Sequence, residues 1–123
     1  MKLRIRWVTL IVGAALGIGA MDGAASAQSF IDGNKLLQQC ANANTQRYCV
    51  YYVGGVWDAT LIAQTFSGAP QRGRGCINFQ AVNSQQAADV VMRWLQAHPE
   101  LRHAGAGGLV IRALSEAWPC PME

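Results

Sequence analysis

The four cysteines are the residues of this sequence with the most distinctive chemistry, and they are Cys40, Cys49, Cys76 and Cys120. An even number of cysteines in a small chain is typical of two disulfides when the protein is exported to an oxidising compartment. A zinc site would need closely spaced ligands, yet the sequence has no Cys-x-x-Cys pair and no histidine at ligand spacing to a cysteine. We therefore predict two disulfides, no metal site and no free thiol for nucleophilic chemistry.

Other residue types with catalytic potential are poorly placed for catalysis. His98 and His103 lie five positions apart across a proline, which suits neither a helical metal pair nor an acid–base dyad. No serine stands in the sequence context of an activated nucleophile, and no two carboxylates have a spacing useful for acid–base catalysis. The sequence therefore predicts a protein that is not an enzyme and needs no cofactor.

Residues 1–27 have the pattern of a cleavable signal peptide. A basic segment over residues 2–6 precedes an apolar run over residues 8–21, and Ala25-Ser26-Ala27 supplies the small residues of a cleavage site. The apolar run is shorter than the roughly 20 residues that span a bilayer. We expect cleavage near Ala27 to leave residues 28–123 as one small periplasmic domain without a membrane segment.

The charge of the mature part excludes one class of partner. Residues 28–123 contain seven basic and six acidic residues, so their net charge is +1, against +3 for the full chain. Nucleic-acid binders carry basic patches interleaved with aromatic residues, and no such stripe is present. We therefore expect no nucleic-acid partner.

The elements that would position these residues are predicted to be helical throughout. Apolar residues recur at helical spacing over residues 33–44, 45–64, 83–98 and 106–117, and no segment alternates with period two. Asn34 is placed to cap the first helix, and Asn83 with Gln86 forms a capping box for the third. The second helix, with few polar interruptions, is expected to be largely buried. The predicted fold is a small all-α bundle of about four helices, arranged as two helical hairpins.

Two antiparallel hairpins predict a pairing for the cysteines. Cys40 ends the first helix and Cys49 begins the second, while Cys76 precedes the third helix and Cys120 follows the fourth. We predict the pairs Cys40–Cys49 and Cys76–Cys120. The alternative Cys49–Cys76 pair would have to reconnect the two ends of a helix of about 27 Å, which the intervening loop could allow.

Gly54 and Gly55 stand in the middle of the second helix, where each costs roughly 1 kcal/mol relative to alanine. Close approach of another backbone would offset this cost, and it could come from packing against the fourth helix or from a homodimer seam. Asp58 lies one turn further on and is expected to accept hydrogen bonds from a neighbouring backbone or from Arg112.

Residues 65–82 contain three glycines and a proline, which predicts a surface loop. Arg72 and Arg74 must be exposed in such a loop. Arginine is enriched at binding hot spots because its planar fork makes paired hydrogen bonds to carboxylates. These two arginines are our candidates for binding a partner protein, although a loop that only aids solubility would have the same composition.

An ordered set of motifs resembles the Rap/Tai immunity proteins, which protect bacteria from peptidoglycan amidases delivered by type VI secretion. The matching segments are Leu36-Leu37, Cys40, residues 49–59, Cys76, residues 85–95, His98-Pro99-Glu100, His103, Leu109-Val110, Ala113-Leu114 and Ala117-Trp118-Pro119-Cys120. Together they cover nearly all of the mature chain, and the closing aromatic-Pro-Cys after a His-Pro-Glu turn is the most specific of them. Ile77 to Gln80 depart from the family pattern, which usually has a proline and a short loop after this cysteine.

The resemblance implies an all-α periplasmic fold, frequent homodimerisation and inhibition by physical occlusion of a toxin's active-site cleft. Our leading hypothesis is accordingly a non-enzymatic periplasmic immunity protein that binds a peptidoglycan amidase. A second hypothesis is a periplasmic stress or chaperone-type protein on the same scaffold, which would expose apolar surface as the pH falls from 7 to 3. A third, a cell-wall hydrolase, ranks last because no catalytic constellation is visible.

Overall fold

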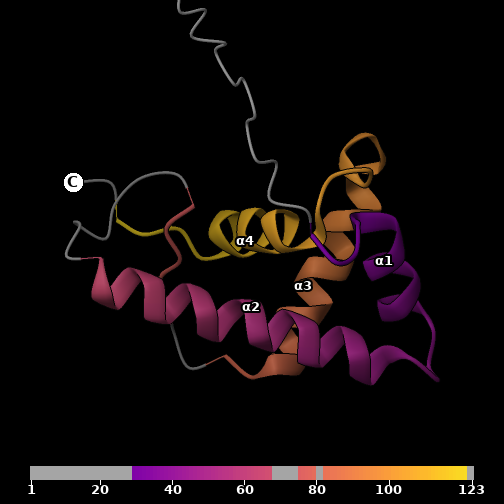
Figure 1. The fold of residues 1–123 in the computed structure, drawn as a ribbon, viewed down its shortest axis with the longest axis horizontal. Coiled ribbons are helices and arrows are strands. Elements are labelled where there is room, and N and C mark those ends of the chain that lie inside the picture. Colours follow the sequence, from indigo (N-terminus) through magenta and orange to yellow (C-terminus); the bar gives the residue numbers. More distant parts are fainter. Residues whose placement is uncertain (1–28, 68–74, 80–81, 122–123) are drawn as a thin grey trace, which may run out of the picture.

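The computed structural model describes residues 29–67, 75–79 and 82–121. Within these residues the chain forms four α-helices, α1 (Gly33–Ala41), α2 (Gln46–Phe66), α3 (Ser84–Ala97) and α4 (Ala106–Ala117), and one 3-10 turn, η1 (Pro99–Leu101). Figure 1 shows α2, the longest helix, along the lower edge of the view, with α3 crossing behind it and α4 lying above it. None of the described helices is long and apolar enough to cross a membrane. The predicted all-α fold is confirmed.

Local signals in the sequence set most of the helix ends. The capping box of α3 forms as predicted: Gln86 N–H donates to Asn83 Oδ1 at 2.9 Å, and Asn83 N–H donates to Gln86 Oε1 at 3.0 Å. The same helix ends before His98-Pro99, because the residue before a proline avoids the helical region. The N-cap of α1 differs from the prediction. Asp32, not Asn34, accepts a hydrogen bond from Lys35 N–H at 2.8 Å, because α1 already begins at Gly33.

The core lies where the apolar stripes of the helices converge. Its fully buried side chains come from all four helices and from the segment before α3, and the largest are Leu36, Ile77, Leu95, Leu114, Val53, Val91 and Val110. The described residues contain no buried polar or charged side chain. Burial of apolar side chains, at roughly 1.5–3 kcal/mol each, is therefore the main source of stability in this small domain.

Both predicted disulfides are present, and the alternative Cys49–Cys76 pair is excluded. Cys40 pairs with Cys49 across the turn between α1 and α2, with Cα atoms 5.0 Å apart. Cys76 pairs with Cys120 across 44 residues, with Cα atoms 5.7 Å apart, and so joins the segment before α3 to the segment after α4. All four cysteines are buried.

The prediction that α2 is largely buried is wrong. Of its 21 residues only Cys49 and Val53 are buried, and Leu61, which the periodicity placed on the inner face, is 39% exposed. The helix packs on α1, α3 and α4 along one side only and extends beyond them along the edge of the molecule. The core formed by the described residues therefore does not account for its apolar composition on every side.

Candidate protein-binding surface

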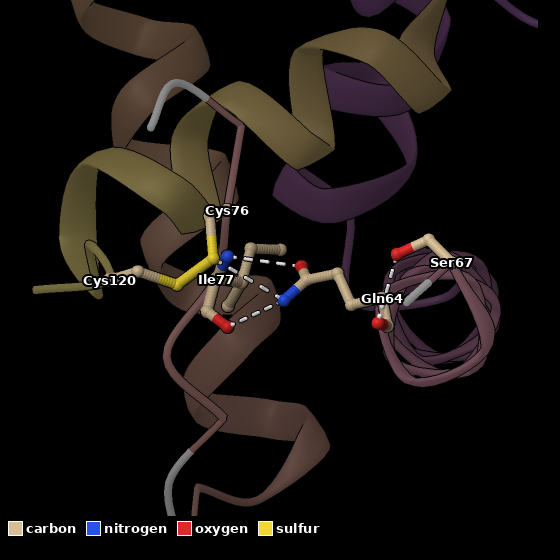
Figure 2. Close-up of a disulfide and its surroundings, with 5 residues drawn as sticks. All are labelled: Gln64, Ser67, Cys76, Ile77 and Cys120. Atoms are coloured by element: carbon tan, nitrogen blue, oxygen red, sulfur yellow. Dashed lines mark hydrogen bonds between the residues drawn. A yellow bond between two sulfur atoms is a disulfide. The ribbon is translucent and has the colours of Figure 1, made fainter. Parts of the chain in front are cut away.

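The connection between α2 and α3 carries the predicted partner-binding residues. The described residues on either side of them are held together by several hydrogen bonds. Arg72 and Arg74 lie outside the described residues. Figure 2 shows how the described flanks are fixed, with Gln64 near the end of α2 facing Cys76 and Ile77. The Gln64 side chain accepts from Ile77 N–H at 3.1 Å and donates to Ile77 C=O at 3.2 Å and to Cys76 Sγ at 3.5 Å.

This arrangement, which we call the Gln64 bridge, lets a side-chain amide pair with both backbone groups of Ile77, as a neighbouring strand would. On the other side of the same segment, Ile77 forms an isolated antiparallel bridge with Pro119, and Asn78 N–H donates to Trp118 C=O at 2.8 Å. The start of the segment is thereby tied to α2 and to the chain end near Cys120. Sequence reasoning missed Gln64, because a glutamine near a helix end carries no signal of a distant backbone partner.

Aromatic rings reinforce this end of the molecule. The Trp57 ring of α2 packs edge-on against Phe79 at 4.9 Å and against Trp118 at 5.7 Å between ring centroids. Such contacts contribute roughly 0.5–1.5 kcal/mol beyond the area they bury. The end of α2, residues 76–79 and residues 118–120 therefore form one connected unit at the base of the predicted binding loop.

Gly54 and Gly55, in the middle of α2, do not pack against α4, which was one of the two expected explanations for them. A methyl group at Gly54 would meet only the Ser84 Cβ, at 4.0 Å, and one at Gly55 would meet no atom of the described residues within 4 Å. The glycine that faces α2 from α4 is Gly107, where a methyl group would meet the Tyr52 hydroxyl at 3.6 Å. That distance is an ordinary van der Waals contact, so no glycine of α2 or α4 is required by the packing of these two helices, and the dimer seam stays a proposal for Gly54 and Gly55.

We expect Gly55→Ala to raise the free energy of unfolding by about 0.5–1 kcal/mol, because alanine restricts the unfolded chain and no described atom obstructs its methyl group. Chemical denaturation at the lowest usable protein concentration measures the effect on the single chain. Gly33→Ala is the matched control. A methyl group there would lie 2.6 Å from Leu109 Cδ1 and 3.0 Å from the Arg102 backbone, so this variant should lose stability. A loss at Gly55 as well would contradict the prediction.

Asp58 is exposed, which corrects the expectation that it accepts hydrogen bonds inside the fold. Arg112, its expected partner, pairs instead with Glu116 one turn further along α4, with 3.1 Å between Arg112 Nε and Glu116 Oε1. Asp58 has no ion pair within the described residues. Removal of its side chain should therefore change the stability of the single chain by no more than about 0.5 kcal/mol.

A small polar cluster joins α3 to α4. The Trp94 indole N–H donates to Glu116 Oε2 at 2.6 Å, and the His98 ring stacks on the Trp94 ring with centroids 4.0 Å apart. His98 Nδ1 lies 2.8 Å from Trp94 C=O, and because a carbonyl only accepts, this nitrogen donates. The imidazole is therefore held by a backbone carbonyl and an indole, and not by a group that it could activate.

Glu116 is the one described group whose ionisation is clearly shifted. The hydrogen bond from Trp94 lowers the pKa of Glu116 most, and burial opposes it. The hydrogen bond and charge of Arg112 and the charge of His98 lower the pKa further. This carboxylate is therefore stabilised in its charged form at neutral pH. It connects two helices, because it accepts a hydrogen bond from Trp94 of α3 and pairs with Arg112 of α4.

Because the pKa of Glu116 is lower in the folded chain than in the unfolded chain, its stabilising contribution is present above about pH 4.5 and is lost as the pH falls through the folded value. We expect Glu116→Gln to lower the free energy of unfolding at pH 7 by less than about 1 kcal/mol, because the carboxylate is half exposed and screened by solvent. The difference from the parent protein should be smaller at pH 3 than at pH 7. Denaturant titrations at the two pH values measure it, and a difference that grows on acidification would contradict the assignment.

The described residues also present an open groove and a set of exposed apolar side chains. No cluster of three metal-ligating side chains occurs in the part of the chain that the structure describes, and the described cysteines are all paired. An open groove of about 340 Å³ lies beside α3 and is lined by Val82, Gln86, Asp89, Val90, Arg93 and Trp118. Apart from Phe30, the exposed large apolar side chains all lie on α2, with Tyr51 72% and Phe66 82% exposed.

Comparisons with known proteins agree with these features. No significant match was found among curated proteins or among solved structures. A family model described as Rap1a immunity proteins matches residues 32–120, which include all four helices and both disulfides. The resemblance stated from the sequence is thereby confirmed. The match spans most of the chain, and the chain therefore belongs to the family of Rap1a immunity proteins.

Proposed function

We propose that this protein is a periplasmic, non-enzymatic immunity protein which, as a homodimer, binds a type VI-secreted peptidoglycan amidase and occludes its active-site cleft. The observation that carries the proposal is the match of residues 32–120 to a family of immunity proteins. Immunity proteins act by binding a toxin, so a rigid surface serves this role better than reactive groups do. The two disulfides and the fully apolar core give the chain such a rigid body.

The proposed location is the periplasm, where the amidase would attack the cell wall. We propose that residues 1–27 are a signal peptide removed near Ala27, and that residues 28–123 form the single mature domain. The disulfides support this location, because disulfides persist in the periplasm and are rare in the reducing cytosol.

We propose that Arg72 and Arg74 contribute to toxin binding through paired hydrogen bonds to carboxylates. The Gln64 bridge and the Cys76–Cys120 disulfide support this proposal, because they hold the flanks of the segment that carries both arginines. A segment with fixed flanks loses less conformational entropy when it binds. The amidase surface that meets it should accordingly be acidic.

The decisive experiment uses an amidase-type protein encoded next to this chain. Cells that export this enzyme should lyse, and co-expression of the full-length immunity chain should restore growth. Calorimetry with the purified, oxidised proteins should give a nanomolar dissociation constant. The double variant Arg72→Ala/Arg74→Ala should weaken binding by at least about tenfold, whereas Arg93→Ala, which removes an exposed arginine from α3, should not.

Two results would count against this function. If the amidase neither binds the chain nor is inhibited by it, the immunity role is wrong. If the purified chain alone releases fragments from peptidoglycan, the protein is a hydrolase and the non-enzymatic proposal is wrong.

A further inference from the structure

One side of α2 is an apolar surface that the described part of the chain leaves uncovered. Its residues recur every three or four positions and so share one side of the helix. We call this surface the outer face of α2, and it consists of Tyr48, Tyr51, Gly55, Ala59, Ile62 and Phe66, all of them exposed. The exposed fractions of its four large side chains are 50% for Tyr48, 72% for Tyr51, 57% for Ile62 and 82% for Phe66.

The outer face is large for a protein of this size. At about 200 Å² for a large side chain, these fractions leave on the order of 500 Å² of largely apolar surface exposed to water. The largest apolar patch of a typical monomeric protein is about 300–600 Å² and often functional, so the outer face lies in the upper part of that range. A standard interface buries about 800 Å² on each partner, so the large side chains of this face alone supply more than half of that area.

The charges of α2 indicate what covers this face. Arg47 and Asp58 are the only charged residues of the helix, and they lie eleven residues apart, which is three turns. They therefore stand on the same edge of the outer face, about 16 Å apart along the axis, too far apart to pair with each other. Neither forms an ion pair within the described residues, and the Arg47 guanidinium lies over the Tyr48 ring at 5.2 Å.

We propose that the outer face of α2 binds the same face of a second copy of this chain, with the two helices antiparallel and crossing over Gly54-Gly55. A two-fold axis in the interface brings the Arg47 edge of one helix beside the Asp58 edge of the other, and does so twice. The remaining offset along the axis is about 6 Å, which an arginine side chain spans. This inference deepens the proposed function, because it rests on the homodimer and names the surface that forms it.

The side chains of the outer face suit this crossing. Gly55 has no side chain, and a methyl group there would meet nothing within 4 Å in the described chain, so a second backbone can approach at this point. On either side of the crossing, Tyr48 and Tyr51 of one copy come to lie against Ala59 and Ile62 of the other. Large residues thus meet smaller ones, and opposite charges meet at the edge.

The charge-swap variants Arg47→Asp and Asp58→Arg test this arrangement. Analytical ultracentrifugation of protein purified from the periplasm after expression of the full chain should show a dimer. Each single swap places like charges together twice and should raise the dimer dissociation constant by at least about tenfold. The double variant Arg47→Asp/Asp58→Arg restores opposite charges and should return the constant to within about threefold of the parent value. The two residues cannot meet within one chain, so this recovery reports contact between copies.

A second set of variants tests the apolar contact. Ile62→Lys should raise the dissociation constant by at least about thirtyfold, because the residue is buried twice in the dimer. Glu100→Arg, an exposed charge reversal in η1, is the control and should leave the constant unchanged. Far-UV circular dichroism should stay close to that of the parent, since the substituted side chains are exposed in the single chain. Melting temperatures should agree with the parent's only at protein concentrations below the dimer dissociation constant, because dimerisation itself stabilises the fold.

The proposal would be overturned if the parent protein is monomeric at high micromolar concentration, if Ile62→Lys leaves the dimer intact, or if the double swap does not restore the dimer dissociation constant. It would also be overturned if the parent is a monomer and Ile62→Lys abolishes its binding to the amidase. The last would assign the outer face to the toxin. Binding of the amidase by calorimetry is measured separately, so a monomer that still binds it would contradict this inference and leave the proposed function standing.

Discussion

Replacement of both Cys76 and Cys120 by alanine is expected to lower the free energy of unfolding by about 4 kcal/mol. The bridge closes a loop of 44 residues, and the chain entropy that it removes from the unfolded state grows with loop length. Replacement of Cys40 and Cys49, whose bridge closes only nine residues, should cost about 2.5 kcal/mol. Small domains have only about 5–15 kcal/mol in total, so the first variant should be close to unfolding at 37 °C.

Urea denaturation of the two double variants, followed by far-UV circular dichroism, measures this difference. The fully reduced parent protein serves as a reference in which both bridges are absent. If the Cys40/Cys49 variant is the less stable of the two, the prediction is wrong. The stabilisation by each bridge would then be determined by interactions in the native state and not by the loop entropy of the unfolded chain. The unfolding transitions followed by fluorescence should coincide with those followed by circular dichroism. This test is needed because a single free energy of unfolding is defined only for a two-state transition.

Leu95→Ala is expected to lower the free energy of unfolding by about 3 kcal/mol or more. Leu95 is completely buried in α3, which contacts all three other α-helices, and truncation there would leave a cavity. Leu61→Ala is the matched control, since it makes the same chemical change on α2, where the side chain is 39% exposed. This control should cost less than about 1 kcal/mol. Equal losses in the two variants would mean that Leu61 is covered by something outside the described residues.

Most of the fold could be predicted from the sequence because its signals are local. The capping residues Asn83 and Gln86 and the stop at His98-Pro99 act on their own neighbours, and the structure places them as expected. The disulfide pairs followed from the order of the helices, and both are present. The inward positions of α3 and α4 also agree, with Val91, Leu95 and Leu114 among the most buried residues.

The errors about burial and packing all concern α2, and they share one cause. An apolar residue at helical spacing indicates burial only if a neighbouring element covers that side, and the sequence does not show how many sides are covered. Leu61 was therefore placed inward, Asp58 was given a partner, and Gly54 was expected to pack on the fourth helix. Each of these expectations depended on the positions of other helices, which a single helix pattern does not contain.

The candidate site was less predictable than the fold. Arg72 and Arg74 were selected by residue type and loop composition alone, and the structure does not describe them. Gln64, which holds the flank of their segment, makes its hydrogen bonds across 13 positions of the chain. Contacts of that kind depend on the finished fold, so residue types and spacing could not reveal them.

The Gln64 bridge has a consequence for how immunity could diversify. Ile77 is tied to α2 by the Gln64 side chain and Cys76 is tied to Cys120, so contacts made outside residues 68–74 hold the flanks of that stretch. If Arg72 and Arg74 bind the toxin as proposed, substitutions in that stretch would alter toxin recognition while these flanking contacts remain. A lineage facing a new amidase could change its specificity there while it inherits the same framework.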